Sequence, residues 1–462
     1  MVQKGKKEMI RSPKGMHDML PNDLRYVRYL SEVLREVVSY YGFGEIQTPH
    51  LEQTDLFVRP LGESSDVVQK EMYTLRTKGG DSLTLRPEGT APIMRAYAEH
   101  GMISWPQPVK LFYEGSFFRH ENPQRGRFRE FRQFGLEILG ELDPIMDALI
   151  IKIFYQAFKE IGFKNILIHV NSIGNKECRP IHKKELTNYF KKKQNYLCKD
   201  CKRRLKENPL RILDCKMPGC VEIRTQAPQM IEYLCDGCKT HFKGVLEYLD
   251  ESKIPYAFDN FLVRGFDYYS KTVFEIFLEE DPVAVKEHKI EVVSTTDEVV
   301  APVQAPEEEK NEKPTGIALA GGGRYDDLMT LLGQRMLPAV GGGLGIERVV
   351  HEMKRLNLGP KAEAGPKVYV IQIGPAAKRR SFVLLDELRD AGIRADASLS
   401  RDSLKAQLNI AAKVGARVAL ILGQKETMDG SVIMRDMDEG TQETVLQSKL
   451  IEKLKLKLKA KK

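Results

Sequence analysis

A change of pattern near residue 366 is the feature that most constrains the fold. Beyond it, short apolar runs alternate with amphipathic segments, which is typical of parallel strands joined by helical crossovers. The pattern predicts strands over residues 368–373, 395–397 and 418–422, and helices over 379–391 and 403–414. We therefore predict a separate α/β domain, residues 367–455, followed by a basic tail, residues 456–462, in which lysine alternates with leucine.

The segment before this change predicts a different architecture, an antiparallel sheet with flanking helices. Apolar residues recur at helical spacing over 24–41 and 145–161, and residues 127–137 alternate charged and apolar side chains as an antiparallel strand does. Further strands are expected over residues 45–48, 83–86, 109–118 and 166–170, and a basic, solvated helical segment over 179–206. A chain of 462 residues is too long for one core, so two or three domains are expected.

Charge and hydropathy exclude some function classes. Lys and Arg number 72 against 64 Asp and Glu, a formal net charge of +8, which permits nucleic-acid binding without demonstrating it. No apolar run approaches the roughly 20 residues that span a bilayer, and the lysines near the start precede no apolar core of a signal peptide. These features predict a soluble, cytoplasmic protein.

Residues 281–314 differ in composition from the rest of the chain. They are rich in Glu, Lys and Pro and almost devoid of aromatic side chains. Such a segment cannot bury enough apolar surface to offset its ordering entropy. We predict a mostly disordered insertion.

The stretch 262–269 places Arg264 inside an apolar, strand-like run that ends in Tyr268 and Tyr269. A buried guanidinium needs an anionic partner. Asp267 could supply it in a core ion pair, or the partner could be a phosphate or a substrate carboxylate gripped by two parallel hydrogen bonds. The stretch alone favours neither alternative.

Arginines also gather in a predicted hairpin, where residues 118–131 form a strand, a basic loop and a returning strand. Guanidinium groups at one tip could bind a polyphosphate and balance the charge that develops when it is cleaved. The alternative is an exposed hairpin in which Glu121 and Glu130 neutralise the arginines. The position of Arg119 within an aromatic strand favours the functional interpretation.

A glycine-rich stretch, residues 341–348, predicts a strand that enters a helix. It matches neither a Walker loop nor a dinucleotide fingerprint. Its glycines would let a flat ligand or another backbone approach closely. Arg348, on the first helical turn, would then face the same cavity.

All seven cysteines lie between Cys178 and Cys238, which fits a local metal site or reduced thiols better than a secreted disulfide framework. Four of them would fill a structural zinc site. One candidate set is Cys198, Cys201, Cys215 and Cys220; the other replaces the middle pair by Cys235 and Cys238. Cys178 is expected to lie outside both. The surrounding basic helix could contact nucleic-acid phosphates.

Three of these patterns together are similar to the three motifs of class II aminoacyl-tRNA synthetases: the helix with its proline-closed strand, the Arg-x-Glu strand with its basic loop, and the Gly-x-Glu-Arg strand-helix. Residues 262–269 and 321–326 resemble the two signatures of the histidyl-tRNA synthetase family, and residues 14–21 and 85–90 resemble its opening segments. The resemblance spans nearly the whole chain, the insertion excepted.

The resemblance implies an α+β fold, a class II antiparallel sheet flanked by helices, with a homodimer formed through residues 24–49. The implied segments are residues 1–170 and 256–360 for the two parts of the catalytic core, 171–255 for a helical, cysteine-containing insertion, and 367–455 for an α/β anticodon-binding domain.

The implied reaction joins L-histidine to ATP, giving histidyl-adenylate and pyrophosphate, and then moves the histidyl group to its tRNA. By resemblance, the α-ammonium group would be held by Glu88, Gly89, Thr90 and Gln133. Glu137 and Tyr268 or Tyr269 would contact the imidazole nitrogens. ATP would be bound by Arg119, Glu121, Arg127, Arg264 and Arg348, with Arg119 and Arg264 catalytic at the α-phosphate, Arg348 at the γ-phosphate, and Mg²⁺ at the β- and γ-phosphates.

Other functions would leave different marks. A catalytically silent regulatory relative of histidine biosynthesis would be expected to lack the anticodon-binding domain and parts of 262–269. Synthetases for glycine, proline or threonine would not need the tyrosine pair with Glu137. A pure RNA-binding protein would not need Arg119, Arg264 and Arg348 together. The residues present favour the histidine enzyme.

Overall fold

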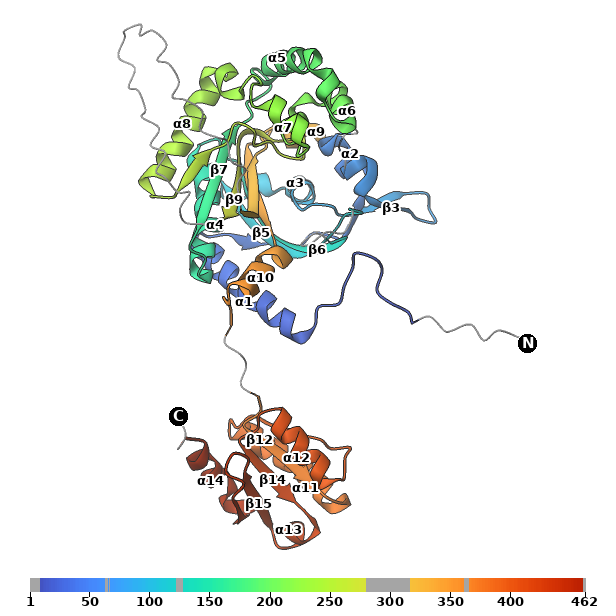
Figure 1. Cartoon of the computed structure of the whole chain (residues 1–462), viewed down its shortest axis with the longest axis vertical. Coiled ribbons are helices and arrows are strands. Elements are labelled where there is room, and N and C mark those ends of the chain that lie inside the picture. Colours follow the sequence, from blue (N-terminus) through green and yellow to red (C-terminus); the bar gives the residue numbers. More distant parts are fainter. Residues whose placement is uncertain are drawn as a thin grey trace, which may run out of the picture. The chain divides into compact units, whose positions relative to one another are not determined.

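The structure is a computed structural model that describes residues 9–62, 65, 67–121, 128–279, 316–360 and 365–459. It divides into two compact units, Met1–Gly359 and Pro360–Lys462 (Figure 1). The insertion predicted over 281–314, and Arg127 at the predicted hairpin tip, lie outside the described residues. Among the described helices, none combines the length and apolar character that crossing a bilayer requires.

An eight-stranded sheet organises the first unit, in the order β1-β5-β6-β11-β10-β9-β7-β8. Its internal pairs are antiparallel, and only the outer pairs β1–β5 and β7–β8 are parallel. The strands are β1 Gly44–Glu45, β5 Val109–Phe118, β6 Glu130–Leu139, β7 Ile166–Ser172, β8 Tyr256–Phe258, β9 Ser270–Leu278, β10 Ile317–Arg324 and β11 Ala339–Gly345. The predicted antiparallel sheet is confirmed.

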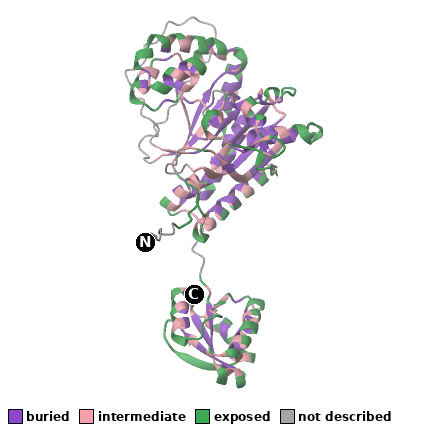
Figure 2. Cartoon of the chain, turned by 90° about the vertical axis from the view of Figure 1, so that its right-hand side faces the viewer, coloured by how far each residue is buried: buried purple, intermediate pink, exposed green. Residues whose placement is uncertain are grey.

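Side-chain alternation along β6 gives this sheet two different faces. Phe134, Leu136 and Ile138 are fully buried on one face, whereas Gln133 and Glu137, an even number of residues apart, share the opposite face. Helices cover the apolar face: α1 Pro21–Tyr40, α4 Ile145–Ile161, α8 Asp236–Glu251 and α10 Ile346–Arg355. The strands are largely buried and the helices expose their outer sides (Figure 2).

Local sequence explains where these helices begin and end. Pro21 occupies the first turn of α1, where its missing N–H costs no hydrogen bond. Gly42 follows the helix with φ +76°, and Gly162 ends α4 with φ +105°, a backbone conformation that favours glycine. Helix α4 has the bounds predicted from its apolar spacing.

The opposite face of the sheet carries smaller elements and leaves room for a cavity. These are helices α2 Asp55–Leu61, α3 Thr90–Glu99 and α9 Leu328–Leu331, the short helices η1 Val67–Glu71 and η2 Met102–Ser104, and a three-stranded sheet of β2 Leu51–Gln53, β4 Ser82–Leu85 and β3 Tyr73–Arg76. A second apolar core lies beneath them and includes Tyr268, Tyr269 and Tyr325.

The cysteine-containing segment folds as a helical insertion between β7 and β8. Its elements are α5 Arg179–Lys192, η3 Gln194–Tyr196, α6 Lys199–Glu207, η4 Pro209–Ile212, α7 Pro218–Arg224 and η5 Met230–Tyr233, before α8. The prediction of one solvated helical segment over 179–206 was wrong in part. The short helix η3 breaks it, and His182, Leu186 and Phe190 are buried against the rest of the insertion.

Residues 262–269 are not part of a strand, contrary to the strand-like pattern, because side chains rather than a strand ladder bind their carbonyls. They form an irregular loop between β8 and β9. Asn171 Nδ2 donates to the carbonyl of Leu262 at 2.9 Å, and Leu262 N closes a turn onto Asp259 O at 3.0 Å. We call this segment the tyrosine loop.

The second unit contains a five-stranded sheet in the order β13-β12-β14-β15-β16. Its elements are β12 Val368–Gln372, α11 Pro375–Asp390, β13 Ala395–Ala397, α12 Leu404–Lys413, β14 Val418–Leu422, α13 Gln424–Met428, β15 Ser431–Asp436, β16 Gln442–Leu446 and α14 Gln447–Lys459. The first three strands are parallel, as predicted, but β15 and β16 add an antiparallel edge that the pattern did not reveal. Leu450 and Leu454 bury one side of the lysine-rich α14.

Candidate active site

A cavity of about 740 Å³ opens on the face of the large sheet opposite α1 and α4, within the usual range for ligand sites. Most residues predicted for the site line it: Glu88, Gly89, Thr90, Arg119, Glu121, Gln133, Arg264, Tyr268, Tyr269 and Arg348. Glu137 does not line it but lies beneath its floor, with 1% of its surface exposed. The wall on one side comes from the cysteine-containing insertion, through Cys198, Arg204, Arg211, Cys215 and Lys216.

Arg264 is paired with Glu275 on β9, at 2.7 Å between Nη1 and Oε1. The alternative of a core ion pair between Arg264 and Asp267 is wrong. Asp267 instead accepts a hydrogen bond from Asn208 of the insertion at 2.6 Å. A Cβ at Gly321 would lie 2.6 Å from Nη1 of Arg264, so this glycine allows the guanidinium to approach β10. The buried Nε of Arg264 has no hydrogen-bond partner among the described residues.

Two more arginines reach the cavity from different elements. Arg119 follows the last residue of β5 rather than lying within the strand; its Nε donates to the carbonyl of Pro87 at 2.8 Å. Its guanidinium lies near the rings of Phe131 and Phe266, at 5.4 and 5.5 Å from their centroids, and 3.8 Å from Glu121. Arg348, in the first turn of α10, donates to the carbonyl of Ala318 at 2.8 Å. Three guanidinium groups, with the carboxylates of Glu121 and Glu275 beside two of them, therefore reach the cavity.

Glu88 closes the N-terminal end of α3. Its carboxylate accepts hydrogen bonds from the backbone N–H of Thr90 at 2.6 Å and of Ala91 at 2.9 Å, which satisfies two helix donors that otherwise lack partners. Burial raises the pKa of Glu88, against these hydrogen bonds, which lower it. The residue thus fixes the position of Thr90 at the cavity wall.

Glu137 joins Thr90 to a tyrosine that the sequence did not single out. Thr90 Oγ1 donates to Oε1 of Glu137 at 2.8 Å, and the hydroxyl of Tyr325 donates to Oε2. Burial raises the pKa of Glu137 to about 8 despite these two donors. A side chain at Gly341 would collide with this carboxylate, because a Cβ there would lie 1.6 Å from Oε2.

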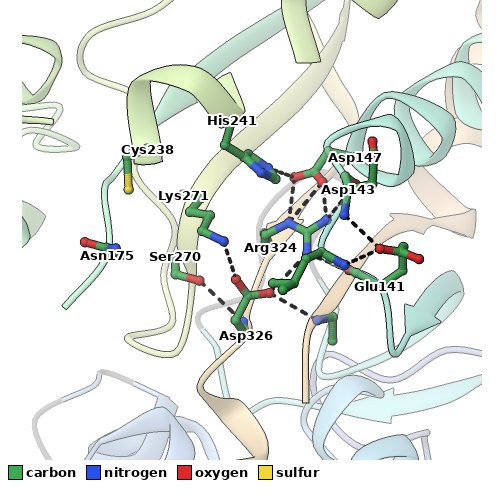
Figure 3. Close-up of polar contacts among 12 residues, drawn as sticks. Glu141, Asp143, Asp147, Asn175, Cys238, His241, Ser270, Lys271, Arg324 and Asp326 are labelled. Carbon is green, nitrogen blue, oxygen red and sulfur yellow. Dashed lines mark hydrogen bonds and ion pairs between the residues drawn. The ribbon is translucent and has the colours of Figure 1, made fainter. Parts of the chain in front are cut away.

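A buried ion-pair network fixes the backbone on both sides of Tyr325 (Figure 3). Arg324 is fully buried and donates to the carboxylate of Asp147 on α4 and, at 3.1 Å, to Asp326. Its other donors reach the carbonyls of residues 141 and 143, so each buried charge is compensated. Lys271 also binds Asp326, at 2.9 Å. This pairing makes the segment over 324–326 a rigid support for Glu137.

Two residues of the site were missed from the sequence, Tyr325 and Tyr113. Tyr113 lines the cavity from β5, and a Cβ at Gly89 or Gly135 would come within 2.4 Å of its ring. A signal for Tyr325 was available in Asp147, an aspartate on the apolar stripe of α4. Such a residue requires a buried cation, and that cation is Arg324, which immediately precedes Tyr325.

The thiols form two separate groups. In the first, the sulfur atoms of Cys198, Cys201, Cys215 and Cys220 all lie within 4.8 Å of one another. The second candidate set is not assembled, because Cys235 and Cys238 lie with Cys178 instead. Cys178 lies outside the assembled set, as expected, but it belongs to a third combination that was not predicted. It lies in the loop between β7 and α5, a position that the linear spacing of the Cys-x-x-Cys pairs could not reveal.

The tyrosine loop is braced by the insertion on both sides. Arg211 of η4 donates to the carbonyl of Gly265 at 2.8 Å. Arg179, the first residue of α5, donates to the carbonyl of Tyr269 at 2.6 Å. The loop carrying Arg264 is therefore positioned by the same insertion that holds the two thiol groups.

Comparison with known proteins agrees with this architecture. The family model for histidyl-tRNA synthetase matches residues 15–287, and that for an anticodon binding domain matches residues 367–457. The chain is 39% identical to the histidine–tRNA ligase of Pelotomaculum thermopropionicum over 97% of its length and 98% of the relative's. It is 41% identical to that of Desulforudis audaxviator, over 97% and 99%.

Solved structures give the same result. The apo histidyl-tRNA synthetase of S. aureus superposes with a TM-score of 0.73 at 32% identity, over 96% of this chain and 99% of that one. An ATP phosphoribosyltransferase regulatory subunit/histidyl-tRNA synthetase from Bacillus halodurans shares the fold, with a TM-score of 0.58 at 20% identity, over 90% and 99%. Near-complete coverage at about 40% identity, together with the matching family models, decides the family. The chain belongs to the histidyl-tRNA synthetase family.

Proposed function

We propose that the cavity of the first unit catalyses the ATP-dependent attachment of L-histidine to its tRNA through histidyl-adenylate. The observation that carries this proposal is the convergence of Arg119, Arg264 and Arg348, from three separate elements, on one cavity that Thr90 lines, with Glu137 hydrogen-bonded to Thr90 beneath the floor. The cations suit a polyphosphate and the floor suits a polar side chain. Family membership supplies the reaction.

Histidine would bind above Glu137. A carboxylate can accept about four hydrogen bonds, and Thr90 and Tyr325 use two of them, which leaves capacity for an imidazole N–H. The hydroxyl of Tyr268 or Tyr269 would bind the other ring nitrogen. Glu88, Thr90 and Gln133 would hold the α-ammonium group, with Gly89 leaving the space that Tyr113 and the substrate occupy.

ATP would bind with its α-phosphate between Arg119 and Arg264 and its γ-phosphate at Arg348. The histidine carboxylate is already a nucleophile and needs no base to attack the α-phosphorus as pyrophosphate leaves. Guanidinium groups held in place stabilise the charge of that transition state, and the fixed geometry removes much of the entropic barrier. Glu121, on the cavity wall, offers an oxygen ligand of the kind Mg²⁺ prefers, and a bound Mg²⁺ would neutralise phosphate charge.

The second unit would bind the anticodon of the tRNA, in keeping with the family model it matches. A cytoplasmic location and a homodimer through α1 and β1 stay predictions. Strand β1 is an edge of the large sheet, and an edge strand presents unpaired backbone groups to a partner. A molar mass near twice 52.6 kDa by light scattering would support the dimer, and a monomeric mass would contradict it.

The four thiols of Cys198, Cys201, Cys215 and Cys220 would hold one structural zinc ion. The sulfurs of Cys198 and Cys215 lie 3.9 Å apart, close to the edge of about 3.8 Å for a tetrahedron of thiolates around zinc. Cys198 and Cys215 line the cavity. The ion would therefore hold the wall that carries Lys216 and Arg211.

Replacing Cys198 and Cys201 by serine is expected to remove one zinc equivalent per chain and to lower the melting temperature, because structural zinc contributes directly to folding free energy. Elemental analysis of the purified chain measures the zinc. Zinc content equal to that of the unmodified protein would exclude this site.

The function itself is tested by ATP–pyrophosphate exchange over a panel of amino acids. We expect exchange with histidine and none with glycine, proline or threonine, because a site built to pair both imidazole nitrogens leaves buried polar atoms unpaired with other side chains. Discrimination of about 10⁴ to 10⁵ is attainable in this way. Exchange with another amino acid would contradict the substrate, and absence of all exchange would favour the regulatory relative.

A further inference from the structure

The second thiol group has not been given a role by the proposed function. Cys178 in the loop after β7, and Cys235 and Cys238 at the start of α8, bring their sulfur atoms within 4.8 Å of one another. Two of the three are buried, and none is in a disulfide. We propose that these three thiolates hold a second zinc ion, with an oxygen as the fourth ligand.

The distances fit a tetrahedral site. Zinc–sulfur bonds of about 2.3 Å place thiolates at the corners of a tetrahedron about 3.8 Å apart, and the sulfurs of Cys178 and Cys238 are 3.8 Å apart. A disulfide would require about 2.05 Å. Oδ1 of Asn175 lies 3.3 Å from the sulfur of Cys178 and 3.8 Å from that of Cys235, near the spacing of about 3.6 Å expected between an oxygen and a sulfur ligand. The fourth ligand is this oxygen or a water beside it.

Packing alone explains the group less well. Met230 and Leu234 surround the thiols, and buried cysteines can serve as small apolar side chains. Apolar packing does not require an amide oxygen, however, and Oδ1 of Asn175 lies 3.3 Å from the sulfur of Cys178 while it accepts the backbone N–H groups of Glu177 and Cys178 at 3.0 and 3.3 Å. The backbone N–H of Asn175 also points to the sulfur of Cys178, at 3.3 Å, which favours a thiolate.

In both thiol groups, two of the cysteines lie at the N-terminal end of a helix. Cys198 is the N-cap of α6 with Cys201 in its first turn, and Cys235 is the N-cap of α8 with Cys238 in its first turn. In both helices the side chain of the capping residue makes no capping hydrogen bond, although N-cap side chains normally bind the exposed N–H groups. Two cysteines three positions apart, with the helix end facing them, favour the thiolate form at both sites.

An ion at the second site would fix the residues that hold the tyrosine loop in place. The importance of this for the reaction rests on the proposed function. Cys178 immediately precedes Arg179, which donates to the carbonyls of Tyr269 at 2.6 Å and Gly174 at 2.9 Å. Gly174 in turn accepts the N–H of Lys271 at 2.8 Å. Figure 3 shows Cys238 and His241, both from α8; the ring of His241 lies 3.3 Å from Asp147. An ion at the thiols would therefore fix the backbone on which Tyr269 stands.

Zinc analysis of the full chain tests the site directly. We expect two zinc ions per chain, and one in the double variant Cys235→Ser/Cys238→Ser. The exposed Lys176 lies in the same loop, so Lys176→Ala, as the matched control, should keep two. One ion in the unmodified chain that persists in the double variant would overturn the proposal.

If the double variant does not fold, titration of the metal-free full chain with Co²⁺ decides. The first group has four sulfur atoms, which fill one tetrahedral site, so a second ion with thiolate-to-cobalt absorption must lie outside it. Saturation of this absorption at one equivalent would overturn the second site.

In the folded double variant, the KM for histidine should rise about tenfold, a typical effect of loosening the support of a site, with the KM for ATP little changed. Two ions with an unchanged KM would keep the metal site and refute its effect on the loop.

Discussion

Replacing Arg264 by alanine is expected to lower the rate of histidyl-adenylate formation by about 10² to 10³, the usual effect of removing one fixed donor from a developing anion. Its guanidinium reaches the cavity, and its Nε has no partner among the described residues, so donor capacity is available for substrate. Histidine affinity should fall much less, because the imidazole and ammonium contacts come from other residues. Single-turnover adenylate formation, monitored through pyrophosphate release, measures the change.

The pair with Glu275 supplies the control. If Arg264 served only as half of a partly buried ion pair, then Arg264→Ala and Glu275→Gln would lower the free energy of unfolding alike and leave adenylate formation intact. We expect instead that Glu275→Gln retains most of the rate and Arg264→Ala does not. Arg264→Lys should remain defective as well, because an ammonium group cannot make the two parallel hydrogen bonds of a guanidinium.

Much of the first unit could be predicted because its local signals agree with the tertiary structure. Apolar spacing gave the bounds of α4, and alternation gave the cavity face of β6, on which Gln133 and Glu137 lie. Register then decides which neighbours meet: Glu137 pairs with Gly341 on β11, and only a glycine there leaves room for its carboxylate. A one-residue slip would turn these side chains to the other face.

The predictions that were wrong or missing concern features that depend on contacts between residues distant in the sequence. Arg264 meets Glu275 rather than Asp267 because the tyrosine loop is irregular and because Asn208, from the insertion, binds Asp267. Tyr325 meets Glu137 across 188 positions. In the second unit, β15 and β16 were missed because the alternation of strand and helix stops before them. Their pairing is antiparallel, so no crossover helix precedes them as a sequence signal.

Bracing by the insertion links the two proposed metal sites to the chemistry. Arg211 lies between Cys201 and Cys215 in the sequence and binds the carbonyl of Gly265. Arg179 follows Cys178 and binds the carbonyl of Tyr269. Two carbonyls of the tyrosine loop are therefore held by residues close in sequence to the two thiol groups. A loop without strand pairing has few backbone bonds of its own, and such loops open at low free-energy cost. Bracing from outside is what keeps Arg264 in place.

Replacing Glu137 by glutamine is expected to lower kcat/KM for histidine by about 10- to 100-fold, because a buried hydrogen bond to a charged group contributes roughly 1.5 to 3 kcal/mol. The effect should lie mainly in the KM for histidine, with the KM for ATP unchanged. Steady-state aminoacylation with each substrate varied measures both. The control is Tyr325→Phe, which removes one donor to Glu137 but keeps the carboxylate, and which should cost less.

The same substitution should change how stability depends on pH. The pKa of Glu137 is raised to about 8 by burial, above an unfolded value near 4.3. Between these values the unfolded chain has released the proton that the folded chain still binds, so the stability contributed by Glu137 is complete below about pH 4 and is lost as pH rises through 8. The loss approaches about 5 kcal/mol at 1.36 kcal/mol per pKa unit. In Glu137→Gln this part of the loss should vanish, measured as the difference in unfolding free energy from the unmodified chain between pH 5 and 8.

These two results together distinguish a substrate contact from a structural one. Thr90 and Tyr325 bind different oxygens of Glu137, so a glutamine can accept one hydroxyl through its amide oxygen and donate its amide N–H to the other. A purely structural Glu137 would therefore show the altered pH dependence with an unchanged KM for histidine. A substrate contact would change both, because a neutral amide binds an imidazole N–H more weakly than a carboxylate does. Added histidine would also favour the ionised carboxylate and lower its pKa. Histidine should therefore stabilise the unmodified chain increasingly as pH rises from 6 to 8, and Glu137→Gln should lose that pH dependence.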